Sequence, residues 1–271
     1  FWSTYTSPSA PLNGQSVSVN NTSVGKTSAT ATTIALAFDA LGKAKIAVNY
    51  PDAGQLQLDA RYTGTGNEQG LIMLGNDPFV SFPVGLCIMP QDAGAQCVAG
   101  NSNCNVYKKA GESFNLLIQG KAWQVDGDTN YCDNLNTPNY VHSGIALGST
   151  LVAPSGGAAG VISNTSYNHI SNSTNTNTVP QSISEVGVFK FSAKPPASYL
   201  GSSFYNIPLA QSANMGRFVP DRFVVSGVSV LPACGVFSYM DQPFPLAMNI
   251  SAFNTFSSVT QNYQNSFAKG T

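Results

Sequence analysis

The segment from Asp126 to Asn134 is the part of the sequence whose residue types and spacing best suit ligand chemistry. Side chains that carry oxygen recur along it at Asp126, Asp128, Asn130 and Asp133. Calcium loops use such spacing because alternate side chains in a tight loop converge on one hard cation. These four residues are therefore candidate calcium ligands, and calcium is the one candidate cofactor.

A plain turn is the alternative interpretation of this segment. The sequence differs from an EF-hand loop, since it has no Gly at the sixth position and no Glu at the twelfth. Asp and Asn side chains also cap turns by hydrogen-bonding to their own backbone. The sequence leaves both alternatives open.

The cysteines form the second group of chemically informative residues. None belongs to a Cys-x-x-Cys pair, and the two histidines, His142 and His169, lie apart in sequence, which argues against a zinc site. We expect both histidines in loops or on the surface. The five cysteines are Cys87, Cys97, Cys104, Cys132 and Cys234.

Four of these cysteines lie between residues 87 and 132, as in a disulfide-stapled module from an oxidising compartment. Cys97 and Cys104 flank a turn-rich run, so a bridge between them would close a short loop. Cys87 with Cys132 is the preferred second pair, although the other connectivities remain open. Cys234 is predicted to be unpaired, or to have its partner outside this chain.

The lack of familiar catalytic motifs in the sequence favours a non-catalytic protein. The sequence has no Gly-x-Ser-x-Gly elbow, no Walker A loop and no Gly-x-Gly-x-x-Gly before a helix. Several of its 13 acidic residues, such as Asp39 and Asp52, stand in turn contexts rather than in glycosidase-like pairs.

The low charge of the chain limits the kinds of partner that it can bind. Only 9% of the residues are charged, against about 25% in ordinary soluble domains. Few Lys and Arg side chains are available to neutralise phosphates, so we predict no nucleic-acid partner. The longest apolar runs are shorter than 18 residues, so we also predict no membrane-spanning helix.

Alternating apolar residues predict an all-β fold. Residues 55–62 alternate strictly, and residues 32–38 and 44–50 resemble a hairpin, whereas residues 164–177 are polar and predict a mobile loop. We predict tandem immunoglobulin-like β-sandwiches, the last one incomplete. The predicted domains are residues 1–84, residues 85–215 with the disulfides, and residues 216–271.

Two blocks near the carboxyl end carry a family resemblance. They are Gly216-Arg217-Phe218-Val219-Pro220-Asp221 and Cys234-Gly235-Val236-Phe237-Ser238-Tyr239-Met240. These blocks, with weaker matches from about residue 30 onward, resemble MshQ-like proteins, which are encoded with the mannose-sensitive haemagglutinin (MSHA) type IV pilus. The resemblance implies a secreted, non-catalytic, multi-sandwich protein that acts in adhesion or pilus assembly. Its expected partners are pilus proteins and surface glycans.

A structural subunit of an extracellular bacterial filament or sheath is the alternative function. The low charge suits close packing of neighbours, and an unclosed last domain could donate strands to another copy. The chain opens on Phe1 without an initiator Met and ends after a strand-like run. We therefore expect a processed or excised piece of a longer bacterial polypeptide, located outside the cell or on its surface.

Overall fold

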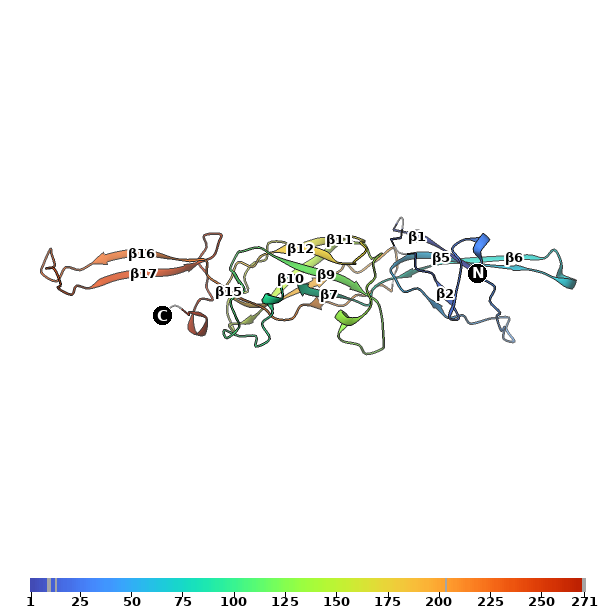
Figure 1. Ribbon diagram of the computed structural model, residues 1–271, viewed down its shortest axis with the longest axis horizontal. Helices are drawn as coiled ribbons and strands as arrows, with labels where there is room; N and C mark the ends of the chain where they lie inside the picture. The colour runs from blue at the N-terminus through green and yellow to red at the C-terminus, as the bar shows by residue number, and fades with distance from the viewer. Residues whose placement is uncertain (9–10, 13, 203, 270–271) are drawn as a thin grey trace.

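The computed structural model describes residues 1–8, 11–12, 14–202 and 204–269. This part of the chain forms strands and short 3₁₀ helices, and it contains no helix long and apolar enough to cross a membrane. The fold is all-β, as the sequence predicts. Three units follow one another along a single long axis, so the molecule is elongated (Figure 1).

The first unit packs two small sheets against each other. One sheet has the order β1-β5-β6, and the other has the order β3-β2-β4. Alternate residues of β5, such as Leu56, point into a core that includes Val17, Val19 and Tyr50. The strands are β1 (Trp2–Ser7), β2 (Ser18–Val19), β3 (Thr22–Ser23), β4 (Val48–Asn49), β5 (Gly54–Thr63) and β6 (Ile72–Ser81).

The distal half of the β5–β6 hairpin extends beyond this core. We call residues 60–76 the N-terminal arm, and Figure 1 shows it at the opposite end of the molecule from β16 and β17. The predicted strand over residues 32–38 is wrong, and of residues 44–50 only Val48 and Asn49 join a sheet. An apolar alternation becomes a strand only where a neighbouring strand pairs with it, and residues 32–38 have none.

The middle unit is a closed sandwich with the main core of the molecule. Its larger sheet has the order β11-β10-β13-β15-β8, with β14 pairing to β13, and its smaller sheet has the order β12-β9-β7. Phe189 and Phe191 of the larger sheet meet Leu116 and Ile118 of the smaller one.

The strands of the middle unit are β7 (Gly85–Pro90), β8 (Lys108–Lys109), β9 (Phe114–Lys121), β10 (His142–Ala153), β11 (Ser166–His169), β12 (Asn177–Gln181), β13 (Gly187–Lys194), β14 (Ala210–Gln211) and β15 (Met215–Val219). The predicted boundary at residue 216 therefore falls inside β15, a strand of the middle sheet. The 3₁₀ helices of the chain are η1 (Ser28–Thr30), η2 (Gly66–Glu68), η3 (Ala93–Ala95), η4 (Tyr131–Asp133) and η5 (Asn265–Phe267).

The Asn-, Ser- and Thr-rich segment 164–177 is built into the middle unit rather than forming a loose loop. It contains β11, and Asn175 is fully buried with its side-chain amide donating to the Gly120 carbonyl. The Asn172 carboxamide oxygen accepts hydrogen bonds from Thr174 and Thr176. The low hydrophobicity of this segment predicted a mobile loop. In the structure, its amide side chains form hydrogen bonds with one another and with the backbone, and these bonds hold the segment in place.

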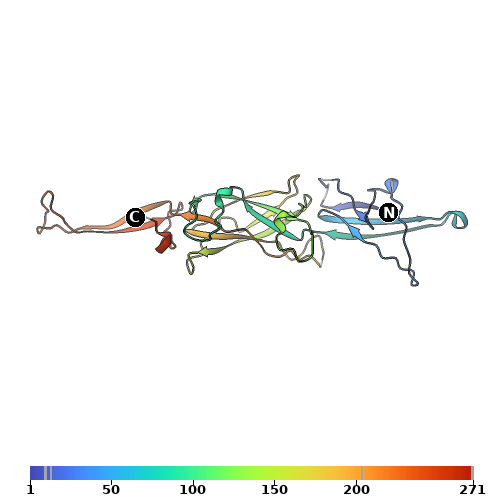
Figure 2. The ribbon, with the colours of Figure 1, turned by 60° about the horizontal axis from the view of Figure 1, so that its bottom comes forward.

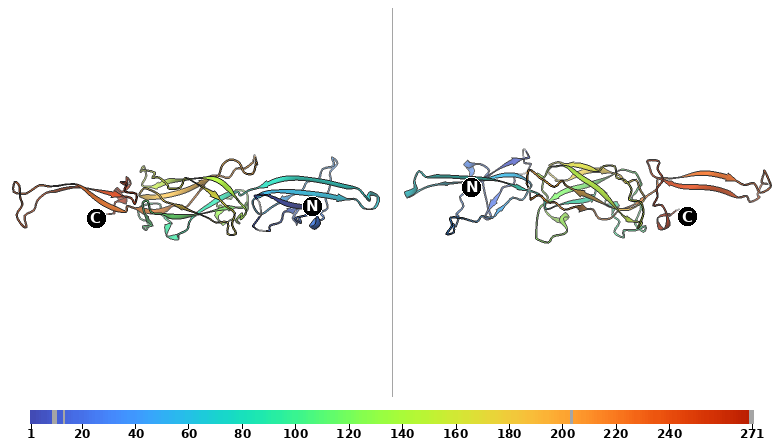
Figure 3. Two further views of the ribbon diagram at one scale, coloured as in Figure 1. Left: turned by 90° about the horizontal axis from the view of Figure 1, so that it is seen from above. Right: turned by 180° about the vertical axis from the view of Figure 1, so that it is seen from behind.

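The third unit is a single two-stranded hairpin followed by a short return segment. β16 (Arg222–Val230) pairs antiparallel with β17 (Leu246–Phe253), with an irregularity between Ser226 and Ser229. We call residues 222–253 the C-terminal hairpin. It projects along the long axis in every view (Figure 2, Figure 3), and in the described residues no second sheet covers it.

Candidate functional site

A buried carboxylate joins the first unit to the middle unit. Asp52 lies between β4 and β5 and is 2% exposed. Its Oδ1 accepts hydrogen bonds from the backbone N–H groups of Ala53 at 2.8 Å and Asn139 at 3.0 Å. Its Oδ2 accepts from the Asn139 side-chain amide at 2.9 Å. Asn139 in turn accepts from the Leu12 backbone N–H at 2.7 Å, so it binds two segments of the first unit.

Aromatic side chains surround this junction and remove it from water. Burial raises the pKa of Asp52, against the opposing effect of its three hydrogen bonds. Burial also raises the pKa of Tyr50 to about 12, and the Tyr5 hydroxyl donates to the Ala53 carbonyl. The sequence marked Asp52 only as a turn residue, because its partner Asn139 is 87 positions away.

A second buried carboxylate joins the middle unit to the segment after the C-terminal hairpin. Glu185 is 5% exposed, and it accepts hydrogen bonds from the backbone N–H groups of Gln261 at 2.9 Å and Asn262 at 3.1 Å. The Asn262 side chain bonds both the N–H and the C=O of Ala158. Glu185 lies in one of the weaker family matches, but the sequence assigned it no role, since its partners lie about 76 residues further on.

The C-terminal hairpin presents an apolar face that is covered only at its base, where Phe223 packs on Tyr263 and Ala252 is buried. Cross-strand pairing places Phe223 opposite Ala252, and Val225 opposite Ile250. Val225 is 51% exposed and Ile250 is 60% exposed. The intervening residues Val224 and Ser226 point to the other face, as strand geometry requires. The hairpin therefore has the amphipathic pattern of one half of a sandwich.

The two blocks that carry the family resemblance lie on either side of β16, one where the middle unit leads into the hairpin and the other at the hairpin tip. The first block covers β15 from Gly216 onward and its exit, where Asp221 forms ion pairs with Lys109 at 2.9 Å and with Arg222 at 2.7 Å. The second block forms the hairpin tip, where Met240 is 98% exposed. Phe237 and Tyr239 make an edge-to-face contact at this tip. One block thus anchors the hairpin, and the other is presented to solvent.

The candidate calcium loop is held together by its own hydrogen bonds. Asp128 accepts from the Asn130 backbone N–H and from the Asn134 side chain. Asp133 accepts from the Asn130 side chain, and Asp126 accepts from the Trp123 indole. Within the described residues, no three His, Cys, Asp or Glu side chains are grouped as a metal site. These bonds are those of the plain-turn alternative, and calcium binding stays a prediction.

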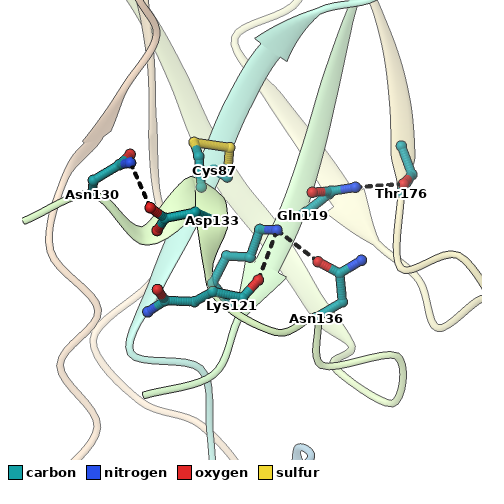
Figure 4. The surroundings of a disulfide bond; sticks show 9 residues. Cys87, Gln119, Lys121, Asn130, Asp133, Asn136 and Thr176 are labelled. Atoms are coloured by element: carbon teal, nitrogen blue, oxygen red, sulfur yellow. Dashed lines mark hydrogen bonds between the residues drawn. A yellow bond between two sulfur atoms is a disulfide. The ribbon is translucent and has the colours of Figure 1, made fainter. Parts of the chain in front are cut away.

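Both disulfides favoured by the sequence form in the middle unit. Cys87 pairs with Cys132, and Cys97 pairs with Cys104. Next to the first bridge, the buried ammonium of Lys121 donates to the Asn134 carbonyl and the Asn136 side chain (Figure 4). Burial lowers the pKa of Lys121. The bridge and this ammonium together fix the chain around η4 to β7 and β9.

Cys234 and the two histidines are the other residues that the sequence analysis singled out. Cys234 is free and half-buried near the hairpin tip, where its sulfur contacts Gln242. The expectation that both histidines are loop or surface residues is wrong for His169, which is fully buried on β11 and bonded to Tyr167 and Asn175. Aromatic rings around His169, including Tyr140 at 5.0 Å, exclude water from it.

These features define a class of protein: a linear array of β-sandwich units, joined by buried polar contacts and ending in an open hairpin. Three family models match successive parts of the chain. They are DUF6701, a domain of unknown function, first Ig-like domain (residues 1–76), DUF6701, second domain (residues 82–180), and DUF6701, third domain (residues 185–271). The chain belongs to the DUF6701 family. No curated protein and no solved structure matches it.

Proposed function

We propose that this chain is a non-catalytic bacterial cell-surface protein associated with an MSHA-like type IV pilus, where it acts in adhesion or pilus assembly. The observation that carries the proposal is the pair of sequence blocks that resemble MshQ-like proteins, at residues 216–223 and 234–240. The second of these blocks is the solvent-exposed tip of the C-terminal hairpin. An exposed recognition tip at the end of an elongated molecule suits an adhesin or an assembly factor.

Two further observations support a location outside the cytosol. Two disulfides suit an oxidising compartment, because cytosolic thiols are kept reduced. A surface with few charged residues suits close packing against other surface proteins. The proposed partners are pilus proteins, with surface glycans as the ligands of the adhesin form.

Immuno-electron microscopy of intact cells tests the proposal, using antibody against this chain. Label at pilus ends or on the outer membrane, lost when the pilus genes are deleted, is the expected result. Label spread evenly over cells that make no pilus would contradict pilus association. A glycan-binding screen with the wild type and Tyr239→Ala would then separate adhesion from assembly, because only an adhesive tip loses signal with that ring.

A structural subunit of an extracellular filament or sheath is the second candidate function. The specific observation that favours it is the uncovered apolar face of the C-terminal hairpin, which a neighbouring subunit could cover. In the same microscopy experiment, label at regular spacing along a fibre would support the filament subunit and contradict the minor pilus component.

A further inference from the structure

The C-terminal hairpin lacks the second layer that its sequence pattern requires. Seven large apolar side chains lie along it, each about half exposed: Phe223, Val225, Val228, Val230, Leu246, Met248 and Ile250. A sheet that is hydrophobic on one face is stable in water when that face packs on another element. These side chains present roughly 600 Å² of apolar surface, of the same order as the ~800 Å² per partner in a stable interface.

The first unit has a matching uncovered surface at the other end of the molecule. The row of β5 and β6 residues that forms its core continues past the core into the N-terminal arm, where Tyr62 pairs with Met73. Both of these side chains are exposed. Next to this row, an open apolar groove is lined by Ile46, Val48, Leu58 and Phe79. The open surface thus lies on the inner side of a sheet, where a second sheet would normally pack.

The two surfaces belong to opposite ends of one chain, with the closed middle unit between them (Figure 1, Figure 3). A single molecule therefore cannot bring them together. Charge does not oppose their contact either, since Asp241 is the only charged residue between Arg222 and Phe253. Asp77 is the single charged residue that lines the groove.

We propose that the C-terminal hairpin of one molecule packs on the inner face of the N-terminal arm of a second copy of this chain. The contact covers Val225 and Ile250 of one copy with Tyr62, Met73 and the adjoining groove of the other. It joins two different surfaces, so it is heterologous, and repetition along the long axis produces an open chain of molecules rather than a closed dimer. The inference does not depend on pilus association.

Sedimentation of the purified chain over a wide range of concentrations tests the contact. We expect the average mass of the wild type to rise above the 28.4 kDa of the monomer as concentration increases from about 1 μM to about 1 mM, a range that spans the affinities found for interfaces of this size. A wild type that stays monomeric over the whole range would overturn the proposal.

Paired substitutions locate the contact on the correct faces. Val225→Lys and Met73→Lys each place a charge in one half of the interface, and we expect each to weaken association at least tenfold. Ser226→Lys and Leu74→Lys are the matched controls on the opposite faces of the same strands, and both should associate like the wild type. Loss of association in Leu74→Lys would contradict packing through the inner face.

Mixing the two blocked variants separates head-to-tail contact from pairing between two hairpins. Met73→Lys retains an intact hairpin and Val225→Lys retains an intact arm, so the mixture should stop at twice the monomer mass while each variant alone stays monomeric. If Met73→Lys associates with itself as strongly as the wild type, the hairpins pair with each other and the head-to-tail contact is wrong. Circular dichroism of each variant checks that it is folded.

Discussion

The middle sandwich and the C-terminal hairpin contain strands of similar apolar pattern, but only the strands of the sandwich bury their apolar side chains. Phe189 and Phe191 on β13 are almost completely buried, whereas Phe223 and Val225 on β16 are about half exposed. β13 has hydrogen-bonded neighbours on both sides and a second sheet facing it, but β16 pairs only with β17. Composition and alternation therefore indicate which face a strand would bury, and the presence of a second layer decides whether it does so.

The largest expected effect is the loss of stability when a core side chain of the middle unit is truncated. Phe189→Ala is expected to destabilise the middle unit by about 4 kcal/mol, because it removes a fully buried ring and leaves a cavity. Val225→Ala, on the exposed hairpin, is expected to change stability by less than about 0.5 kcal/mol. Urea denaturation, with hydrogen exchange of β9 and β13 as a local readout, measures both. Equal losses for the two variants would mean that the hairpin is covered in solution.

Removal of the long-range disulfide is expected to lower the free energy of unfolding nearly as much as Phe189→Ala. The Cys87–Cys132 bridge spans 45 positions, for which the chain-entropy model gives about 4 kcal/mol. The Cys97–Cys104 bridge spans only 7 positions, for which the same model gives about 2.5 kcal/mol. Thermal unfolding of the two double Cys→Ser variants compares them. A larger loss from the short bridge would show that local packing outweighs chain entropy here.

The buried imidazole should make the middle unit sensitive to acid. Burial lowers the pKa of His169 to about 4, whereas the ordinary value is 6.5. The unfolded chain therefore takes up a proton before the folded chain does. The contribution of His169 to stability is constant above about pH 6.5 and falls by about 3 kcal/mol as pH drops to about 4.

Chemical denaturation at pH 7 and at pH 4.5 measures this acid sensitivity. His169→Gln should flatten the part of the pH dependence that comes from this residue, and His142→Gln is the matched control, because His142 is only half-buried. A pH dependence that His169→Gln leaves unchanged would assign the acid sensitivity to other groups.

The smallest expected effect concerns the junction between the first and middle units. Asn139→Ala removes the side-chain donor to Asp52 and the acceptor for Leu12, and should weaken the junction by about 2 kcal/mol. Burial raises the folded-state pKa of Asp52, so its protonated form favours docking, and the junction loses stability as pH rises through that pKa.

Small-angle scattering measures the effect on the junction as a change in the maximum dimension of the molecule. The variant should sample bent shapes while each unit keeps its own unfolding transition. Unchanged scattering would mean that the aromatic packing around Asp52 is sufficient to hold the two units in line.

The sequence predicted features that depend on nearby residues or on periodicity. The short spacing of Cys97 and Cys104, the alternation in residues 55–62 and the open pattern of the last unit all correspond to the structure. The residues that join the units were not predictable in this way. Asp52 and Glu185 act through partners 76 or more positions away, and a single sequence holds no record of such pairs.

The predictions for residues 32–38, residues 164–177 and His169 were wrong for related physical reasons. Residues 32–38 have the composition of a strand but no pairing partner, and residues 164–177 have the composition of a loop but a network of amide hydrogen bonds. His169 looked like a surface residue because its burial depends on Tyr140, which a separate segment before β10 places against it, as well as on Tyr167 of its own strand. In each case tertiary context overrode local preference.

The Cys87–Cys132 disulfide also determines whether a single proteolytic cut separates the chain into two pieces. The loop from Trp123 to Asn130 is largely exposed, and it lies between Cys87 and Cys132. A cut in this loop would break the polypeptide but leave its two pieces covalently joined through sulfur. A nicked molecule would therefore migrate as one band without reductant and as two bands with it. Cleavage at this site would leave the hairpin tethered to the first unit.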